Sequence, residues 1–274
     1  MYTEYQPSHL LVPYIDNYWE FKGNPDYGMR IHILPDGCTD FIFTLGEVAN
    51  AVEAGSLMMQ PYRSYFVGPM TKYSELVTYT ESIHMFGVRF LPCGLSCFTN
   101  LPLHEFVNSR VSTNEMKAVF DDTFIERLGE QKHVADRIRV VEEYLLAYLA
   151  RHYQPADSHV AMAVNMINHS EGKRSVRSLM DDVCLCQRHF ERKFKHYTGF
   201  TPKEYSRIVK FKNAVELLRT TTSANLLTTA VDAGYYDLAH FSKEIKSMSG
   251  NTPASFLSLT VPEETTLTYI EPQR

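Results

Sequence analysis

Two stretches, VRSLMDDVCLCQRHFERKFKHYTGFTPKEY (Val176–Tyr205) and LTTAVDAGYYDLAHFSKEIKSMSGNTPASF (Leu227–Phe256), repeat one pattern and decide the fold of the C-terminal part of the chain. Each has a short segment of apolar periodicity, a tight turn, and a second segment that ends in Phe-Lys or Ile-Lys before a Gly, a Thr-Pro pair and an aromatic residue. Two short helices around a tight turn form a helix-turn-helix, whose second helix is shaped to lie in the major groove of DNA. The repeat therefore predicts two such units on one chain.

The segment between the two copies, Lys203–Arg219, carries apolar residues at helical spacing. As a helix it would be roughly 25 Å long at about 1.5 Å per residue. A rod of that length can hold two reading helices in successive segments of the major groove, which repeat about every 34 Å. We therefore expect a long helix to join the two units.

The residues expected to face DNA are those in and next to the second helix of each copy that the small core of the helix pair does not use. Arg pairs with guanine edges and Gln with adenine edges, whereas Lys193 and Lys195 suit phosphates. In the second copy Asp237 is predicted to cap the helix, and the low charge of its DNA side predicts weak base reading. The predicted DNA-binding residues are Gln187, Arg188, His189, Glu191, Arg192 and Lys195 in the first copy, and Tyr236, Leu238, Ala239, His240 and Lys243 in the second.

From Ser158 to Phe256 the chain resembles the DNA-binding domain of the AraC/XylS family of bacterial transcription regulators. The stretch AVDAGYYDLAHFSKEIK (Ala230–Lys246) and the Gly, Thr-Pro and Phe after it carry most of the resemblance, together with the Arg and Phe positions of the first copy. The resemblance implies a sequence-specific transcription factor with an all-α C-terminal domain.

Three positions depart from the family's pattern. Cys186 stands where the family usually has a serine that caps the first reading helix, Met180 replaces a small alanine, and Ile245 replaces a phenylalanine. Losing an oxygen cap typically costs ~1 kcal/mol. We therefore expect the first reading helix to begin without a side-chain cap.

Charge is distributed unevenly along the chain. The net charge is -5, yet Ser158–Leu259 holds 14 Lys and Arg against 9 Asp and Glu, which leaves 13 of the 27 basic and 23 of the 32 acidic residues elsewhere. The C-terminal part is basic and the N-terminal part is acidic. This indicates that the C-terminal part binds a polyanion and that the N-terminal part binds a different partner.

The N-terminal part reads mostly as short strands separated by turn residues, which predicts a small antiparallel barrel or sandwich that can hold a small molecule. The predicted strands are Tyr18–Phe21, Arg30–Leu34, Asp40–Leu45, Ser64–Val67, Glu75–Thr80 and His84–Phe90. The segments LPDGCTD (Leu34–Asp40) and GVRFLP (Gly87–Pro92) resemble recurring segments of one type of sensor domain that accompanies the AraC/XylS module.

Helices are expected after Pro92, over Leu103–Val107, Thr113–Phe120, Asp122–Leu128 and Gln131–Tyr153. The last has an apolar stripe that includes Val134, Ile138, Val141, Leu145 and Leu149. This stripe fits a homodimer seam and packing on the chain's own barrel or neighbouring helices equally well, because it covers fewer than four heptads.

A domain boundary is expected at Gln154–Ser158, where a proline ends one helix and Asp157 or Ser158 caps the next. The predicted class is α+β: a barrel-like sensor and dimerisation domain with trailing helices over 1–153, a double helix-turn-helix domain over 158–259, and a polar tail over 260–274.

Candidate ligand-binding residues in the N-terminal domain are Arg89, His32 and Asp36. An unpaired charge in an apolar strand is costly, so Arg89 either pairs with Asp36 or Asp40, which we favour, or faces a ligand anion.

The other polar motifs predict less. His32 and His84 stand alone, without the spacing of a metal site. The pairs Cys184/Cys186 and Cys93/Cys97 are better explained as buried side chains than as a redox or metal sensor. A sensor at the second pair would require Cys38, His84 and His104 to converge on it in space.

The sequence favours a regulator whose partners are double-stranded DNA, possibly a small-molecule effector, a second copy of the chain, and RNA polymerase if it activates transcription. The longest apolar runs are too short for a membrane span and no export signal begins the chain, so we expect a cytoplasmic protein with no membrane contact and no cofactor. The alternative is an enzyme or small-molecule carrier with its chemistry in the barrel. A DNA-repair methyltransferase is a weaker one, since the cluster of zinc-ligand cysteines it requires is absent from the N-terminal region.

Overall fold

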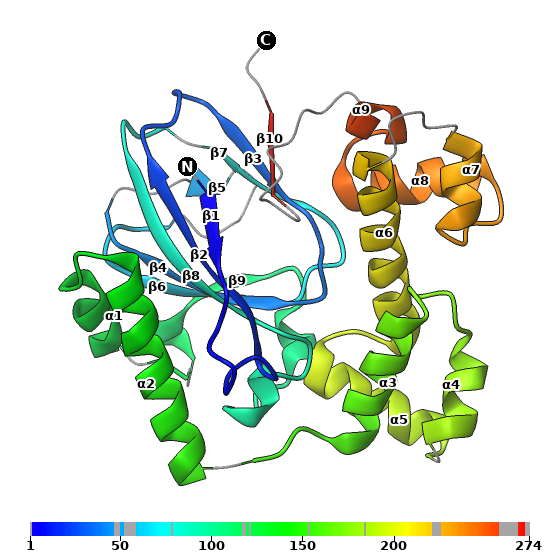
Figure 1. Cartoon of the computed structure of the whole chain (residues 1–274), viewed down its shortest axis with the longest axis horizontal. Coiled ribbons are helices and arrows are strands. Elements are labelled where there is room, and N and C mark those ends of the chain that lie inside the picture. The colour runs from blue at the N-terminus through cyan, green and yellow to red at the C-terminus, as the bar shows by residue number, and fades with distance from the viewer. Residues whose placement is uncertain are drawn as a thin grey trace.

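The computed structural model describes residues 2–46, 50–51, 59–77, 79–116, 119–120, 122–152, 154–183, 185–220, 226–257 and 268–271. The N-terminal part forms two β-sheets and a layer of helices, and the C-terminal part is a helical domain that lies alongside them (Figure 1). The α+β class expected from the sequence is confirmed.

Within the described residues the larger sheet has six strands in the order β1-β2-β8-β4-β6-β9, and all neighbours are antiparallel. Its strands are β1 (Tyr2–Tyr5), β2 (Ile15–Gly23), β4 (Thr39–Thr44), β6 (Ser64–Val67), β8 (Ile83–Phe90) and β9 (Arg110–Ser112). The sequence predicted β2, β4, β6 and β8, whereas β1 and β9 were missed because both are short edge strands that depend on a partner.

The smaller sheet, in the part of the chain that the structure describes, has four strands in the order β10-β3-β7-β5. Its strands are β3 (Arg30–Ile33), β5 (Asn50–Ala51), β7 (Ser74–Val77) and β10 (Thr268–Glu271). The expectation of a plain polar tail over 260–274 needs correction, because β10 pairs with β3 in a register that places Ile270 opposite Ile31. Strand pairing between distant segments leaves little local trace in a sequence.

Strand β4 shows how the larger sheet separates two interiors. Successive side chains of a strand point to opposite faces. Phe41 and Phe43 pack in the core under the helices, whereas Ile42 packs between the two sheets and, with Asp40, lines a cavity there. This alternation gives the N-terminal domain one interior filled with aromatic rings and another that is partly open.

Helices α1 (Asp122–Gly129) and α2 (Val134–His152) cover the outer face of the larger sheet (Figure 1). Val141 and Leu145 of α2 are 0% exposed and belong to the same core as Phe41 and Phe43. The apolar stripe of this helix is therefore used within the chain, and the alternative of a homodimer seam at Leu145 is not supported.

Among the described residues there are three short 3-10 helices. Of these, η1 (Leu95–Cys97) and η2 (Leu103–Phe106) lie between β8 and β9, and η3 (Thr113–Glu115) follows β9. The helix predicted over Thr113–Phe120 is wrong beyond Glu115, since Met116 has extended backbone. Of the rest of that prediction, 117–118 lie outside the described residues.

In the C-terminal domain, all regular secondary structure of the described residues up to 257 is helical. They are α3 (Ser158–His169), α4 (Val176–Val183), α5 (Gln187–Thr198), α6 (Pro202–Thr220), α7 (Leu226–Asp232), α8 (Leu238–Ser249) and α9 (Pro253–Leu257). Helix α3 begins at the boundary that the sequence predicted, and Asp157 caps it by accepting hydrogen bonds from the backbone N–H groups of His159 and Val160.

The two domains share a hydrophobic core. Leu34 and Cys93 of the N-terminal domain pack in one cluster with the helices of the C-terminal domain. Close by, the ring of Tyr205 lies against Gly37, where a methyl group would be only 2.7 Å from the ring. None of the described helices is long and apolar enough to cross a membrane.

Candidate nucleic-acid interface and ligand cavity

Helices α4 and α5 form the first helix-turn-helix. Phe190 and Phe194 on the inner side of α5 are fully buried, and their rings lie 5.6 Å apart in an edge-to-face arrangement. Cys186 occupies the N-cap position of α5 and makes no side-chain hydrogen bond to the helix, as the sequence predicted. The N–H groups of His189 and Phe190 are instead bonded to the backbone carbonyl of Cys186, at 3.0 Å each.

The outer side of α5 carries the predicted DNA-binding residues of the first copy. Gln187, Arg188, Arg192 and Lys195 are exposed, and His189 and Glu191 are partly exposed. Gln187 donates a hydrogen bond to Glu191 at 2.9 Å. Lys193, which the sequence assigned to a phosphate, instead donates to Asp157 at 2.6 Å and ties α5 to the start of α3.

Helices α7 and α8 form the second helix-turn-helix. Asp237 caps α8 by accepting a hydrogen bond from the backbone N–H of His240 at 2.7 Å, as predicted. The turn before it contains Gly234 at φ +80, a conformation that favours glycine. Leu238, Ala239, His240 and Lys243 are exposed, and Tyr236 is 93% exposed.

An ion pair that the sequence did not suggest joins α6 to the second unit. Arg207 donates to both carboxylate oxygens of Glu244, at 2.7 and 3.0 Å. Hydrogen bonding to Glu244 raises the pKa of Arg207. The partners lie 37 positions apart, so no helical spacing signals them.

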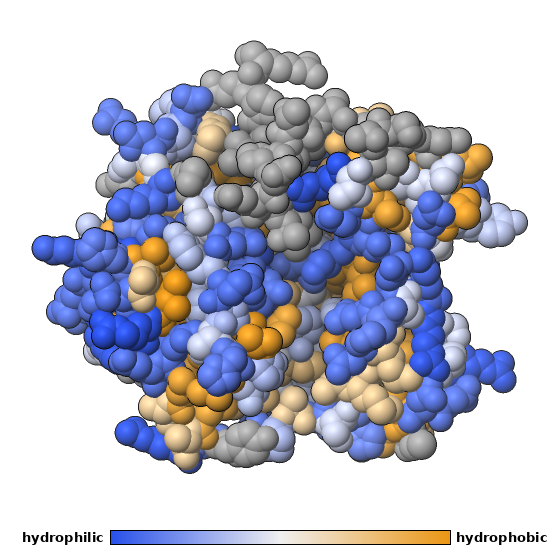
Figure 2. All heavy atoms as spheres, in the orientation of Figure 1, coloured by the Kyte–Doolittle hydropathy of each residue, from blue (hydrophilic) through white to orange (hydrophobic). Residues whose placement is uncertain are grey.

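The two units occupy opposite ends of α6 (Figure 1). With 19 residues this helix is about 28 Å long at about 1.5 Å per residue, close to the length expected from the sequence. Figure 2 shows the face of the molecule seen in Figure 1, where apolar residues form separate small patches within a largely hydrophilic surface.

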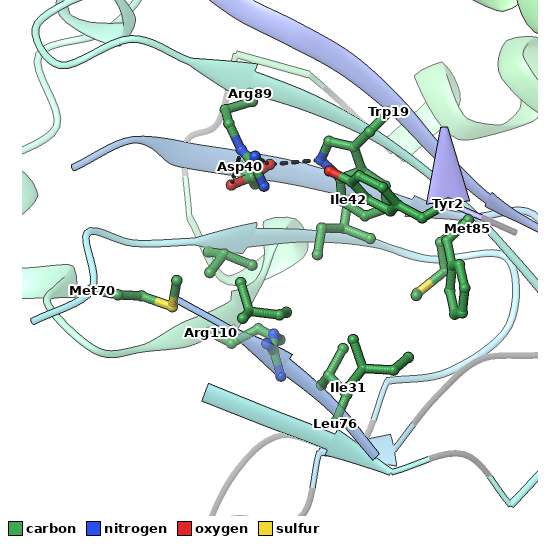
Figure 3. Close-up of a pocket in the computed structure, with 13 residues that line it drawn as sticks. Tyr2, Trp19, Ile31, Asp40, Ile42, Met70, Leu76, Met85, Arg89 and Arg110 are labelled. Carbon is green, nitrogen blue, oxygen red and sulfur yellow. Dashed lines mark hydrogen bonds and ion pairs between the residues drawn. The ribbon is translucent and has the colours of Figure 1, made fainter. Parts of the chain in front are cut away.

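A cavity that is open on one side lies between the two sheets of the N-terminal domain, and its empty volume is about 610 Å³ with the solvent space at the opening included. Most of its lining is apolar. The lining residues are Tyr2, Trp19, Phe21, Ile31, Ile33, Asp40, Ile42, Val67, Met70, Leu76, Met85, Arg89 and Arg110. Figure 3 shows Arg89, Asp40 and Trp19 grouped together, with Arg110 placed apart from them among apolar side chains.

Arg89 lies in a buried cluster of carboxylates. Its Nε is 3.2 Å from Oδ1 of Asp40 and 3.5 Å from Oδ2 of Asp36, so the favoured structural pairing is present. Asp40 also accepts a hydrogen bond from the indole N–H of Trp19 at 2.7 Å. Burial raises the pKa of Asp40, although the charge of Arg89 opposes this shift.

The other two predicted ligand-binding residues do not line the cavity, although Asp36 contacts Arg89. Neither His32 nor Asp36 is among the described residues that line the cavity. His32 stacks on Tyr73, and Asp36 accepts a hydrogen bond from the backbone N–H of Cys38. Sequence reasoning missed Arg110, because only the pairing of β9 with β6 brings it to the cavity.

The cysteines and histidines considered for a sensor have other neighbours. Cys38, Cys93 and Cys97 are buried, and burial raises the pKa of each thiol. Nε2 of His84 lies 2.9 Å from Oε1 of Glu20, and the ring centroid of His104 lies 6.4 Å from that of His196. Cys184 lies outside the described residues, and within them no group of three or more His, Cys, Asp or Glu side chains is placed to hold a metal ion.

Comparison with known families found two matches. Residues 179–258 match a family described as a helix-turn-helix domain, and residues 3–112 match one described as a domain of unknown function, DUF6597. A search of curated proteins found no match.

Several solved structures are similar to this chain. One of ToxT from Vibrio cholerae shares 9% identity over 88% of this chain and 97% of that chain, with a TM-score of 0.52. Another of ToxT, from Vibrio cholerae O395 bound to (E)-4-(8-methylnaphthalen-1-yl)but-3-enoic acid, shares 9% identity over 88% and 98%, with a TM-score of 0.50. A probable AraC family transcriptional regulator from Rhodopseudomonas palustris CGA009 shares 20% identity over 37% and 95%, with a TM-score of 0.34. The two ToxT structures cover both domains, so the likeness in fold extends over most of the chain.

Proposed function

We propose that this chain is a DNA-binding transcription regulator with a helix-turn-helix domain of the AraC type. Its affinity for DNA changes when a small molecule occupies the cavity of its N-terminal domain. DNA binding is supported above all by the two reading helices at the two ends of α6, each of which has its polar side exposed and its apolar side buried. In this proposal the cavity binds a signal and performs no catalytic step.

The first reading helix supplies most of the base specificity. Arg188 and Gln187 are exposed in the first turn of α5, where the residues of a reading helix meet base edges. The exposed positions of α8 include Leu238 and Ala239 and carry little charge, so the second helix sets the register along the groove.

Replacing Arg188 with Ala tests this assignment. We expect affinity for the duplex that the wild-type protein selects from a random-sequence library to fall by about 1 to 3 kcal/mol, because a bidentate contact to guanine is lost. Weak binding to unrelated DNA should persist, since it depends on phosphate contacts. Titration of labelled duplexes at fixed salt measures both quantities.

The matched control is Arg139→Ala, which removes an arginine whose side chain is 65% exposed on α2, outside the helix-turn-helix domain. It should leave both affinities unchanged. If Arg188→Ala keeps the wild-type preference among sequences, Arg188 does not read a base.

We propose that the signal is a largely hydrocarbon molecule with one anionic group. The lining is mostly apolar and includes two cationic side chains, Arg89 and Arg110, of which Arg110 lies apart from the group formed by Arg89, Asp40 and Trp19 (Figure 3). The acid held by one of the ToxT structures is a molecule of this type.

Two dyes that share a ring system test the role of Arg110. We expect Arg110→Met to weaken binding of the anionic dye 8-anilinonaphthalene-1-sulfonate about tenfold, because a charge-assisted contact is worth roughly 1.5 to 3 kcal/mol. Binding of the neutral dye N-phenyl-1-naphthylamine should change little. Fluorescence titration measures both.

Arg63→Met serves as the control, because Arg63 is exposed in the same domain and does not line the cavity. Equal losses for the two dyes in Arg110→Met, or no loss for either, would contradict an anion contact at Arg110.

The proposal also includes a cytoplasmic homodimer, with RNA polymerase as a further partner if the protein acts as an activator. Its support is general: helix-turn-helix proteins commonly bind two half-sites as dimers. Because the apolar stripe of α2 is buried in its own domain, the dimer would use a different surface.

A further inference from the structure

The loop of residues 68–73 joins β6 of the larger sheet to β7 of the smaller sheet, and we call it the β6–β7 loop. It therefore crosses from one wall of the cavity to the other. Met70 within the loop and Val67 immediately before it line the cavity. Any occupant of the cavity meets this loop directly.

The β6–β7 loop is tied to the segment that follows η2. The backbone N–H of Gly68 donates to Ser109 at 3.0 Å, and the carbonyl of Pro69 accepts from the N–H of Asn108 at 2.8 Å. The side chain of Asn108 accepts from the N–H of Thr71 at 2.8 Å. A methyl group at Gly68 would lie 1.9 Å from the carbonyl oxygen of Phe106, so this junction is close-packed.

One end of the loop touches the first helix-turn-helix. Gly199 ends α5 in the left-handed conformation at φ +83, and its N–H donates to the carbonyl of Lys195. The ring of Pro69 lies directly against it, since a methyl group on Gly199 would be 2.5 Å from Cγ of Pro69. The carbonyl oxygen of Leu103 in η2 lies on the same side.

The other end of the loop touches the second helix-turn-helix at the equivalent position. Gly250 ends α8 at φ +76, and its N–H donates to the carbonyl of Lys246. A methyl group there would be 2.7 Å from Cζ of Tyr73. Tyr73 in turn stacks on His32 of β3, with ring centroids 5.4 Å apart and planes 16° from parallel.

One six-residue loop thus contacts the cavity through Met70 and both reading helices through Pro69 and Tyr73. We propose that the β6–β7 loop is the element that transmits occupancy of the cavity to the two reading helices, by setting where the ends of α5 and α8 lie relative to the sensor domain. This inference rests on the proposed function, since it requires a ligand in the cavity and DNA on the helices.

The physical reason is the close packing at both glycines. A ligand that displaces Met70 moves a loop with no free space at Gly199 or Gly250, so the displacement passes to the helix ends instead of being absorbed. Two helices that must enter successive segments of the groove bind DNA well only at one relative position. The ligand and DNA therefore alter each other's affinity by the same factor.

The experiment measures that factor in the full chain. The cavity probe is N-phenyl-1-naphthylamine, and the DNA is the duplex that the wild-type protein selects from a random library. We expect saturating duplex to change the dissociation constant of the dye in the wild-type protein by about fivefold or more, within the range typical of allosteric coupling. In Pro69→Ala/Tyr73→Ala the factor should fall to within about twofold of one, with both separate affinities still measurable.

Pro61→Ala/Tyr62→Ala is the matched control, because it removes the same two residue types from another turn of the same domain, where Tyr62 is 63% exposed. It should keep the wild-type factor. The single substitution Pro69→Ala removes only the ring at Gly199 and should give an intermediate factor, which keeps the test open if the double variant does not fold.

The outcomes separate the two proposals. An unchanged factor in both loop variants, or a factor of one in the wild-type protein despite binding of both dye and duplex, overturns the role of the loop and leaves DNA binding intact. Failure of the wild-type protein to select any preferred duplex overturns the proposed function itself.

Discussion

Replacing Arg89 with Met is expected to lower the free energy of unfolding at neutral pH by about 3 to 5 kcal/mol, the cost of leaving buried charge without its partner. The guanidinium of Arg89 lies between the carboxylates of Asp40 and Asp36, and all three residues are buried. Methionine fills similar space and offers no charge. The variant therefore keeps two neighbouring carboxylates in an interior that no longer neutralises them.

The loss should depend on pH in one direction. Burial raises the pKa of Asp40 in the folded protein, and loss of Arg89 removes the charge that opposes this shift. A carboxyl whose pKa is higher in the folded than in the unfolded state binds more protons when folded, so its contribution to stability falls as pH rises. The deficit of Arg89→Met should therefore shrink as pH is lowered from neutrality towards about 4, the ordinary pKa range of aspartate.

Urea unfolding at several pH values, followed by the fluorescence of Trp19, measures the deficit, since Trp19 is the single tryptophan and contacts Asp40 directly. The control is Arg89→Met/Asp40→Asn, which removes charge from both sides and should recover part of the loss. A deficit that is constant with pH would contradict a buried, charged cluster.

Replacing Phe194 with Ala is expected to destabilise the whole chain by about 3 to 5 kcal/mol through loss of buried area and the cavity it leaves. Phe194 is fully buried and its ring lies 5.8 Å from that of Tyr205. The same cluster includes Leu34 and Cys93 of the N-terminal domain. Because the core crosses the domain boundary, the loss should reach both domains.

Two signals report on the two domains in one urea titration. Circular dichroism at 222 nm follows mainly the helices of the C-terminal domain, and fluorescence follows Trp19 in the N-terminal sheet. Both midpoints should fall together in Phe194→Ala, as they do in a two-state transition.

Tyr236→Ala is the control, because it truncates an aromatic residue that is 93% exposed in the same domain, and it should change stability by less than about 0.5 kcal/mol. A shift of the circular dichroism midpoint alone would show that the domains unfold independently despite their common core.

Local signals were enough to predict most of the helical domain. The cap of α3 by Asp157, the cap of α8 by Asp237 and the uncapped start of α5 at Cys186 all follow from residues within one turn of the helix end. The exposed polar side of α5 follows from helical periodicity in the same way. These features depend on interactions over three or four positions, which a sequence displays directly.

Contacts between distant residues had no such signal. Lys193 has the charge and position of a phosphate ligand, yet its partner is Asp157, 36 positions away. Arg110 reaches the cavity only because β9 pairs with β6.

The sequence by itself thus determined the helical repeat, its caps, the polar sides of its reading helices and most of the central strands. Only the tertiary structure decided the pairing of β10 with β3, the burial of the α2 stripe, the cavity, and the contacts of Pro69 and Tyr73 with Gly199 and Gly250. The physical reason is that propensity, periodicity and capping act between neighbours along the chain, whereas sheet pairing and close packing act between surfaces that meet only after folding.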